Sequence, residues 1–364
     1  MKWSWKIGEF AGIGVFIHVT FLLLIGWVGL VHWLEGKTIQ AVASGVGFIL
    51  AIFTCVVFHE FGHALAARRY GIKTRDITLL PIGGVARLER MPDNPREELW
   101  VALAGPAVNL VIALALYLWL TLTSTWEPLQ SLRVHAGSFM ERLLVVNVIL
   151  AGFNLLPAFP MDGGRVLRAL LATRMDYARA TQIAAGIGQA VALFFGFLGL
   201  FMNPFLLFIA LFVWIGASQE AGMAQMKSAL GGIPVSRAML TDFRTVSPSD
   251  SLGRAVDLIL AGSQQDFPVI ENGSVVGVLL RADVFSTLAR GGQDSPISQV
   301  MRRDFQAVDP GDMLDATFQK LQACACHTVP VTRQGKIAGL LTMDNLGEFI
   351  LIQGALSAAQ RRTR

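Results

Sequence analysis

Residues 39–67 read IQAVASGVGFILAIFTCVVFHEFGHALAA, an apolar run that ends in the motif His59-Glu60-Phe61-Gly62-His63. The run exceeds the about 20 residues that cross a bilayer as a helix. Positions i and i+4 share a helix face, so both imidazoles can bind one Zn²⁺ while Glu60 reaches a water as general base. Ionisable groups at membrane depth cost about 2.5–3.5 kcal/mol on insertion scales, so the motif indicates a functional site.

The composition places this run within a membrane protein. The 364 residues are 53% hydrophobic and 15% charged, with a mean hydropathy of +0.53. The net charge of +4 does not indicate nucleic-acid binding, so we expect no nucleic-acid partner. About six segments are long enough to be transmembrane helices, at residues 16–33, 40–66, 99–122, 141–158, 183–201 and 204–221.

Positive charges gather in alternate connections between these segments. They precede the first span and fill the second and fourth connections, whereas the other connections carry few. By the positive-inside rule we expect a multi-pass protein of the cell membrane with cytoplasmic N- and C-termini. The stretch after Met1 has no small-residue cleavage site, so no cleavable signal peptide is expected.

A catalytic zinc needs a third ligand and one open position. Residues 154–165 read NLLPAFPMDGGR, where two prolines break an apolar span and Asp162 follows. Irregular backbone at membrane depth is tolerated where it lines a cavity, so Asp162 is a candidate ligand; the alternative is a loop acid that caps the next helix. Cys55 shares the face of His59, which permits a role near the metal, but a small buried hydrophobe is favoured.

The two motifs together resemble the site-2 proteases, zinc intramembrane metalloproteases of prokaryotic type. That family pairs HExxH with N-x-x-P-x(4)-D-G, which is present here as Asn154, Pro157, Asp162 and Gly163. The resemblance covers roughly residues 1–225. It implies that His59, His63 and Asp162 bind one zinc ion per chain, that Glu60 is the catalytic acid and base, and that the substrate is a transmembrane protein.

Further residues are candidates for substrate binding. Residues 76–89, DITLLPIGGVARLE, predict a short membrane-associated β-hairpin whose edge at Gly83 and Gly84 can hold an unwound substrate by strand addition, the alternative being an ordinary turn. Asn109 and Asn154 are amides in apolar runs and can bind substrate or an oxyanion, or join two helices. We expect Arg165 to anchor at the membrane interface rather than to pair with Asp162.

The last third of the chain contains an internal repeat. Phe267-Pro268-Val269 aligns with Val329-Pro330-Val331, and the other matched positions keep the same offset of 62 residues. The repeats resemble a tandem pair of cystathionine β-synthase (CBS) domains, small α/β units that pack in twos and often bind adenine nucleotides. The expected domains are a membrane protease domain at 1–225, a linker at 226–234, CBS repeats at 235–292 and 293–353, and a tail at 354–364.

The nucleotide signature of CBS domains, G-h-h-T/S-x-x-D, is incomplete in both repeats. Repeat one has Asp283 but Leu280 where a hydroxyl belongs, and repeat two has Thr342 but Asn345 where the acid belongs. Asp283 and Thr342 are therefore the nucleotide candidates. Binding of an adenine nucleotide and a purely structural or dimerising role stay open as alternatives, and we expect homo-oligomers through this domain.

The sequence thus predicts a polytopic α-helical membrane protein followed by a soluble α/β tandem CBS domain. Its expected function is an intramembrane zinc metalloprotease that cleaves peptide bonds in or near transmembrane segments, regulated by the CBS pair. One alternative is a CBS-regulated channel or transporter, because buried His and Asp side chains also line ion pathways. Another is an inactive scaffold that retains zinc.

Overall fold

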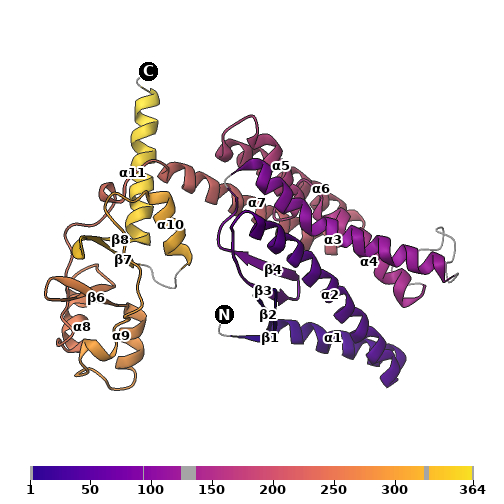
Figure 1. Cartoon of the computed structure of the whole chain (residues 1–364), viewed down its shortest axis with the longest axis horizontal. Coiled ribbons are helices and arrows are strands. Elements are labelled where there is room, and N and C mark those ends of the chain that lie inside the picture. Colours follow the sequence, from indigo (N-terminus) through magenta and orange to yellow (C-terminus); the bar gives the residue numbers. More distant parts are fainter. Residues whose placement is uncertain (1–2, 93, 124–136, 324–327, 363–364) are drawn as a thin grey trace. The chain divides into compact units, whose positions relative to one another are not determined.

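The computed structural model describes residues 3–92, 94–123, 137–323 and 328–362. The chain divides into two compact units, Met1–Ala224 and Gln225–Arg364 (Figure 1). The first unit holds the long apolar helices and one small sheet, and the second holds a sheet with shorter helices. The candidate metal site belongs entirely to the first unit.

Five helices in the described part of the chain are long and apolar enough to cross a membrane. They are α1 (Val19–Gly36), α2 (Ile39–Arg69), α3 (Pro95–Leu122), α6 (Tyr177–Phe201) and α7 (Phe205–Leu230). The sixth predicted span, residues 141–158, corresponds to the 16-residue helix α4 (Phe139–Asn154). This helix ends before Pro157 and Pro160, since proline lacks the backbone N–H and disfavours a helix interior, and α5 (Asp162–Ala172) begins after them.

A four-stranded sheet lies beside α2, in the order β1 (Ser4–Phe10), β2 (Ile13–His18), β3 (Thr74–Leu80) and β4 (Gly83–Leu88). Strands β3 and β4 form the predicted hairpin, with Ile77 opposite Ala86. Strand β2 runs parallel to β3, and Ile13 and Ile77 pack on Ala64 of α2. Strand β4 is therefore an edge strand close to the helix that carries the HExxH motif.

The first hairpin of this sheet is absent from the sequence-based prediction. Its turn, Ala11-Gly12, has φ angles of 53° and 79°, which suit a two-residue hairpin connection. The apolar residues of β2 continue directly into α1, so the prediction merged part of this strand with the first span at 16–33. His18 caps α1 by accepting a hydrogen bond from the backbone N–H of Thr20.

The second unit has a sheet in the order β5 (Phe267–Glu271), β6 (Ser274–Leu279), β8 (Lys336–Thr342) and β7 (Thr328–Arg333). The turns at Asn272-Gly273 and Gln334-Gly335 have positive φ angles at both residues. The helices are α8 (Leu252–Ala261), α9 (Arg281–Leu288), α10 (Leu314–Ala323) and α11 (Met343–Arg362).

Isolated β-bridges join the two repeats of this unit at equivalent positions. Leu240 of the first repeat pairs with Leu340 of the second, and Val278 pairs with Arg302, which are the same two positions with the repeats interchanged. Two departures from the expected boundaries are found. Helix α7 continues to Leu230 and covers the first residues of the predicted 226–234 linker, and α11 continues to Arg362 through most of the predicted tail.

Candidate metal centre

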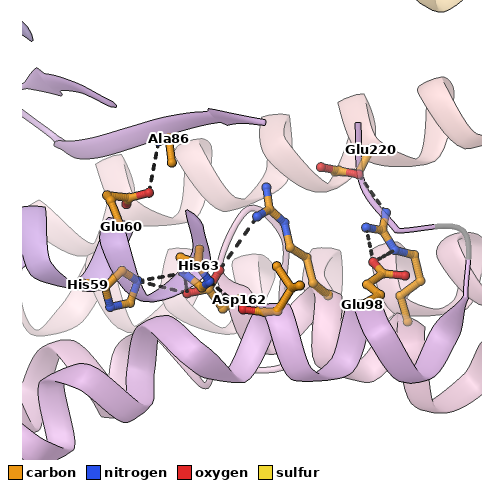
Figure 2. Close-up of polar contacts among 10 residues, drawn as sticks. His59, Glu60, His63, Ala86, Glu98, Asp162 and Glu220 are labelled. Carbon is orange, nitrogen blue, oxygen red and sulfur yellow. Dashed lines mark hydrogen bonds and ion pairs between the residues drawn. The ribbon is translucent and has the colours of Figure 1, made fainter. Parts of the chain in front are cut away.

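Three buried side chains from two helices converge at one point of the first unit (Figure 2). His59 and His63 lie one turn apart on α2, and Asp162 is the first residue of α5. The two Nε2 atoms lie 3.1 Å apart, and Asp162 Oδ2 lies 3.1 Å from that of His59 and 3.0 Å from that of His63. Three atoms able to bind a metal ion thus form a nearly equilateral triangle.

The other nitrogen of each imidazole is held by an acceptor. His59 Nδ1 donates to Asn109 Oδ1 at 2.5 Å, and His63 Nδ1 donates to the Val101 carbonyl at 2.7 Å. With both protons on Nδ1, each Nε2 presents a lone pair toward the other and toward the Asp162 carboxylate. Three acceptors facing one another in a buried site are unfavourable without a cation between them. The donor set therefore fits a resident cation.

The dimensions of the triangle favour zinc. Bonds of about 2.0–2.1 Å at tetrahedral angles separate neighbouring ligand atoms by about 3.3–3.4 Å, close to the observed 3.0–3.1 Å. Two histidines and one carboxylate are also a ligand set of catalytic zinc, which leaves the fourth position for water or substrate.

Helix α3 can approach this site because it has glycine at position 105. A Cβ atom on Gly105 would collide with the imidazoles of both His59 and His63. The same helix supplies Asn109 one turn later and the Val101 carbonyl one turn earlier, so it orients both histidines.

Glu60 lies beside the triangle and contacts the edge strand of the sheet (Figure 2). Its Oε2 accepts a hydrogen bond of 3.0 Å from the backbone N–H of Ala86 on β4. Gly84 permits this approach, since a Cβ there would lie 2.9 Å from Glu60 Cγ and from Val56 Cγ1. The acid of the HExxH motif therefore joins the metal site to the edge of the sheet.

Asp162 does not cap its own helix. The capping position of α5 is occupied by Met161, which makes no side-chain capping bond. Arg165 Nη1 lies 3.9 Å from Asp162 Oδ1, an ion pair one turn along α5, which is the alternative to the expected anchoring at the interface. This charge supports an ionised carboxylate at the metal position.

An ion-pair cluster of the buried Arg168 and Glu98 with the partly exposed Glu220 holds α5 against α3 and α7. Figure 2 shows Glu98 and Glu220 in the same view as the metal site. Arg168 Nε donates to Glu98 Oε1 at 2.8 Å, and Arg168 Nη1 donates to Glu220 Oε2 at 2.9 Å. The side chains of Arg168 and Glu98 are 3% and 0% exposed. The cluster fixes the helix that begins with Asp162.

The structure separates the four substrate candidates. Gly83 and Gly84 lie on the edge strand β4 beside Glu60, and Asn154 is the half-buried last residue of α4. Asn109 is fully buried and hydrogen-bonds to both His59 and Asn147, as expected of the alternative role, a link between helices. Cys55 contacts Asn147 at 3.4 Å rather than the metal position.

The two nucleotide candidates of the second unit are engaged in contacts within the chain. Asp283 accepts hydrogen bonds of 2.7 and 3.1 Å from Arg302, and these raise the pKa of the Arg302 guanidinium. Thr342 Oγ1 accepts from the backbone N–H of Asn345 at 3.1 Å. The Asn345 side chain in turn donates to the carbonyl of Ala238.

Sequence reasoning did not single out Asn147, Arg168, Glu98 or Glu220. Asn147 is an amide in an apolar segment, the same signal that identified Asn109 and Asn154. Glu98 and Glu220 lie near the ends of apolar segments, where an acid is ordinarily solvated, so only the packing of α3, α5 and α7 reveals them.

An HExxH pair completed by a carboxylate, with the motif's acid beside the metal position, is the site of a zinc metalloprotease. A model of peptidase family M50 matches residues 47–195, and a CBS domain model matches residues 235–290 and 297–351. A zinc metalloprotease from Methanocaldococcus jannaschii is 35% identical over 280 residues, covering 77% of this chain and 78% of that protein.

A relative from Synechocystis sp. is 31% identical over 366 residues, covering 96% of this chain and 90% of its own. The solved site-2 protease from Methanocaldococcus jannaschii is 36% identical and covers 60% of this chain and 95% of that one, with a TM-score of 0.45. The chain belongs to peptidase family M50, the site-2 proteases, and carries tandem CBS domains. It is a membrane metalloprotease.

Proposed function

We propose that this chain hydrolyses peptide bonds within or beside the transmembrane segments of other membrane proteins, using one zinc ion held by His59, His63 and Asp162. The observation that carries the proposal is the buried triangle of three metal-binding atoms on a membrane helix, with Glu60 next to it. Regulation by the CBS pair completes the proposed activity.

When bound, zinc would polarise the scissile carbonyl and acidify the attacking water. Glu60 takes the proton of that water and delivers it to the leaving amine, which needs one carboxylate to act first as base and then as acid. Asn109 and the Val101 carbonyl keep the Nε2 lone pairs of His59 and His63 on the metal side. Asp162, paired with Arg165, supplies the negative ligand.

The edge of the sheet is the proposed substrate-binding element. A transmembrane substrate arrives as a helix whose amides are bonded internally, and it must unwind to expose the scissile bond. Strand β4 is the last strand of the sheet, and Gly83, which has nothing within 4 Å of an added Cβ, leaves room for a second backbone, while Gly84 faces Glu60. Addition of a substrate strand there would present its peptide bonds beside Glu60. Asn154 remains a candidate for contacts with the substrate backbone.

The proposed topology is six crossings with both termini in the cytoplasm. Helix α4 is about 24 Å long at 1.5 Å per residue, shorter than the about 30 Å hydrocarbon core, and residues 155–161 would complete its crossing. The positively charged second and fourth connections support this orientation.

The proposed role of the CBS pair is to alter cleavage when an adenine nucleotide binds near Asp283 and Thr342, in a homo-oligomer formed through this unit. A ligand changes activity only if it prefers one conformation, and a typical coupling is about 5- to 150-fold. Titrating the full-length chain with ATP, ADP and AMP while measuring cleavage tests this. An unchanged rate at millimolar nucleotide leaves dimerisation as the role of the pair.

The test of the protease itself uses Glu60→Gln in co-expression with candidate single-span membrane proteins. The variant should retain about one zinc per chain and lose at least about 10²-fold in cleavage rate, the lower range for general acid–base catalysis. Near-normal cleavage by the variant would end the assignment. Zinc without cleavage in the wild type would indicate an inactive scaffold, and neither zinc nor cleavage would favour a channel or transporter.

A further inference from the structure

A chain of side-chain hydrogen bonds leads from His59 away from the metal position, through α3, and ends on α4. His59 Nδ1 donates to Asn109 Oδ1 at 2.5 Å, and Asn109 Nδ2 donates to Asn147 Oδ1 at 3.0 Å. Asn147 Nδ2 then donates to the backbone carbonyl of Leu143 at 2.8 Å. The bond from His59 to Asn109 has a role in the proposed mechanism, whereas Asn147 has no role in it.

The Leu143 carbonyl at the far end determines which group donates and which accepts in every hydrogen bond of this chain. The Leu143 carbonyl can only accept, so Asn147 must turn its NH₂ group toward it and its oxygen toward Asn109. Asn109 must then present NH₂ to Asn147 and oxygen to His59. That oxygen can only accept, so the His59 proton is on Nδ1, and the Nε2 lone pair faces the metal position.

Because the two amides are buried, the donor and acceptor directions of these hydrogen bonds are fixed. Asn109 and Asn147 are each 0% exposed, so water cannot replace a lost partner or satisfy a reversed amide. The three side chains belong to α2, α3 and α4, and each amide therefore also fixes the spacing of two helices. Reversing one amide would set two like groups against each other at about 3 Å in a dry environment.

We propose that Asn147 is a positioning residue of the zinc site, which acts through Asn109 to set the tautomer and orientation of His59. The inference rests on the zinc site proposed above. The Leu143 carbonyl fixes the orientation of the Asn147 amide. Asn147 in turn orients Asn109, which is the one side chain between Asn147 and His59.

Cys55 is a neighbour of this chain of bonds and not one of its links. Its Sγ lies 3.4 Å from Asn147 Nδ2 and accepts a weak hydrogen bond from it. The Leu143 carbonyl already orients Asn147, so the thiol is not needed for the order of the bonds. Cys55→Ala should therefore leave the zinc affinity of the full-length chain within about threefold of wild type, in contrast to changes at Asn147.

The experiment measures zinc affinity by chelator competition on the purified full-length chain. Asn109→Leu should weaken binding by about 10- to 100-fold, and Asn147→Leu by about 10-fold, the range found when partners of ligating histidines are lost. The double variant should bind within about threefold of Asn109→Leu alone, because Asn147 acts through Asn109. The proposal would be contradicted if the losses of zinc affinity in the two single variants multiplied in the double variant. Wild-type affinity in Asn147→Leu would contradict it as well.

Two further variants separate positioning from packing. Thr181→Val removes the hydrogen bond from the fully buried Thr181 to the Tyr177 carbonyl on α6, and should leave zinc affinity unchanged. Asn147→Asp is isosteric, and the burial of this position favours the protonated carboxyl group, which can donate to Leu143 and accept from Asn109, so affinity should stay within about threefold of wild type. A loss in Asn147→Asp equal to that in Asn147→Leu overturns the role assigned to Asn147. Absence of zinc binding in the wild type would instead overturn the site itself.

Discussion

Glu60 and Ala86 connect the HExxH helix to the edge of the sheet through a single hydrogen bond, 3.0 Å long, from a backbone N–H to a carboxylate. This contact gives the acid a fixed direction without using a side chain of the sheet. It also occupies a backbone donor at the edge where a substrate strand would be added. In the proposed mode of substrate binding, the substrate and the base would therefore meet at the same residue of β4.

Ala86→Pro tests this contact, because proline lacks the N–H and is tolerated in an edge strand. A hydrogen bond to a charged group contributes about 1.5–3 kcal/mol, so we expect kcat to fall by about 10-fold or more with zinc content unchanged. Ala86→Ser keeps the N–H and should cleave at the wild-type rate. Equal kcat values for the two variants would show that the bond does not orient Glu60.

Asp162→Ala should weaken zinc retention as well as cleavage, because two histidines alone leave the ion under-coordinated. Metal content after dialysis against a chelator measures the effect. Asp176→Ala is the matched control, since Asp176 caps α6 through the N–H of Arg179 and lies outside the site. Zinc retention equal to wild type in the Asp162 variant would mean that the third ligand is another residue.

Gly105→Ala should disrupt the metal site through volume alone. The added methyl group would occupy the space of the His59 and His63 imidazoles, so the histidines or helix α3 must move. We expect zinc affinity to fall by at least about 10-fold, comparable to the loss of an orienting partner. Gly152→Ala on α4 is the control, because no atom lies within 4 Å of its added Cβ. Normal zinc affinity in both variants would contradict the close packing of α3 on α2.

Arg168→Met should destabilise the first unit by leaving Glu98 buried without its cation. Breaking a buried ion pair by removing one partner costs about 3–5 kcal/mol. Thermal unfolding in detergent, followed by circular dichroism, should show a lower midpoint, partly restored by adding Glu98→Met. The control is Arg174→Met, at an exposed position of the same segment. An unchanged midpoint for Arg168→Met would show that the cluster does not hold α5 in place.

Much of the fold follows from local signals in the sequence. Long apolar runs predict α2 and α3 because a helix must satisfy its own backbone in lipid. The Ala11-Gly12 hairpin was missed because β2 is apolar and continues into α1, so hydropathy does not separate the strand from the helix.

The candidate site was predictable where chemistry restricts the residue type. His59, His63 and Asp162 carry groups that apolar helices otherwise avoid, which made them candidates, and the spacing of the two histidines together with the family resemblance indicated the metal site. The role of Asn109 was not predictable from the sequence. An amide can bind substrate, bind an oxyanion or link two helices, and only its partners distinguish these roles. Asn147 is a partner of Asn109 across 38 residues, a relationship that only the packing of α3 on α4 creates.

The length of α2 bears on where a substrate would be cut. Its 31 residues extend about 46 Å, well beyond the about 30 Å of hydrocarbon, and His59 lies about 30 Å from its first residue. In the proposed topology the cutting point would lie toward the end of α2 that carries Arg68 and Arg69. A substrate helix would need to unwind only its last turns on that side, and the fragment released there would carry few apolar residues.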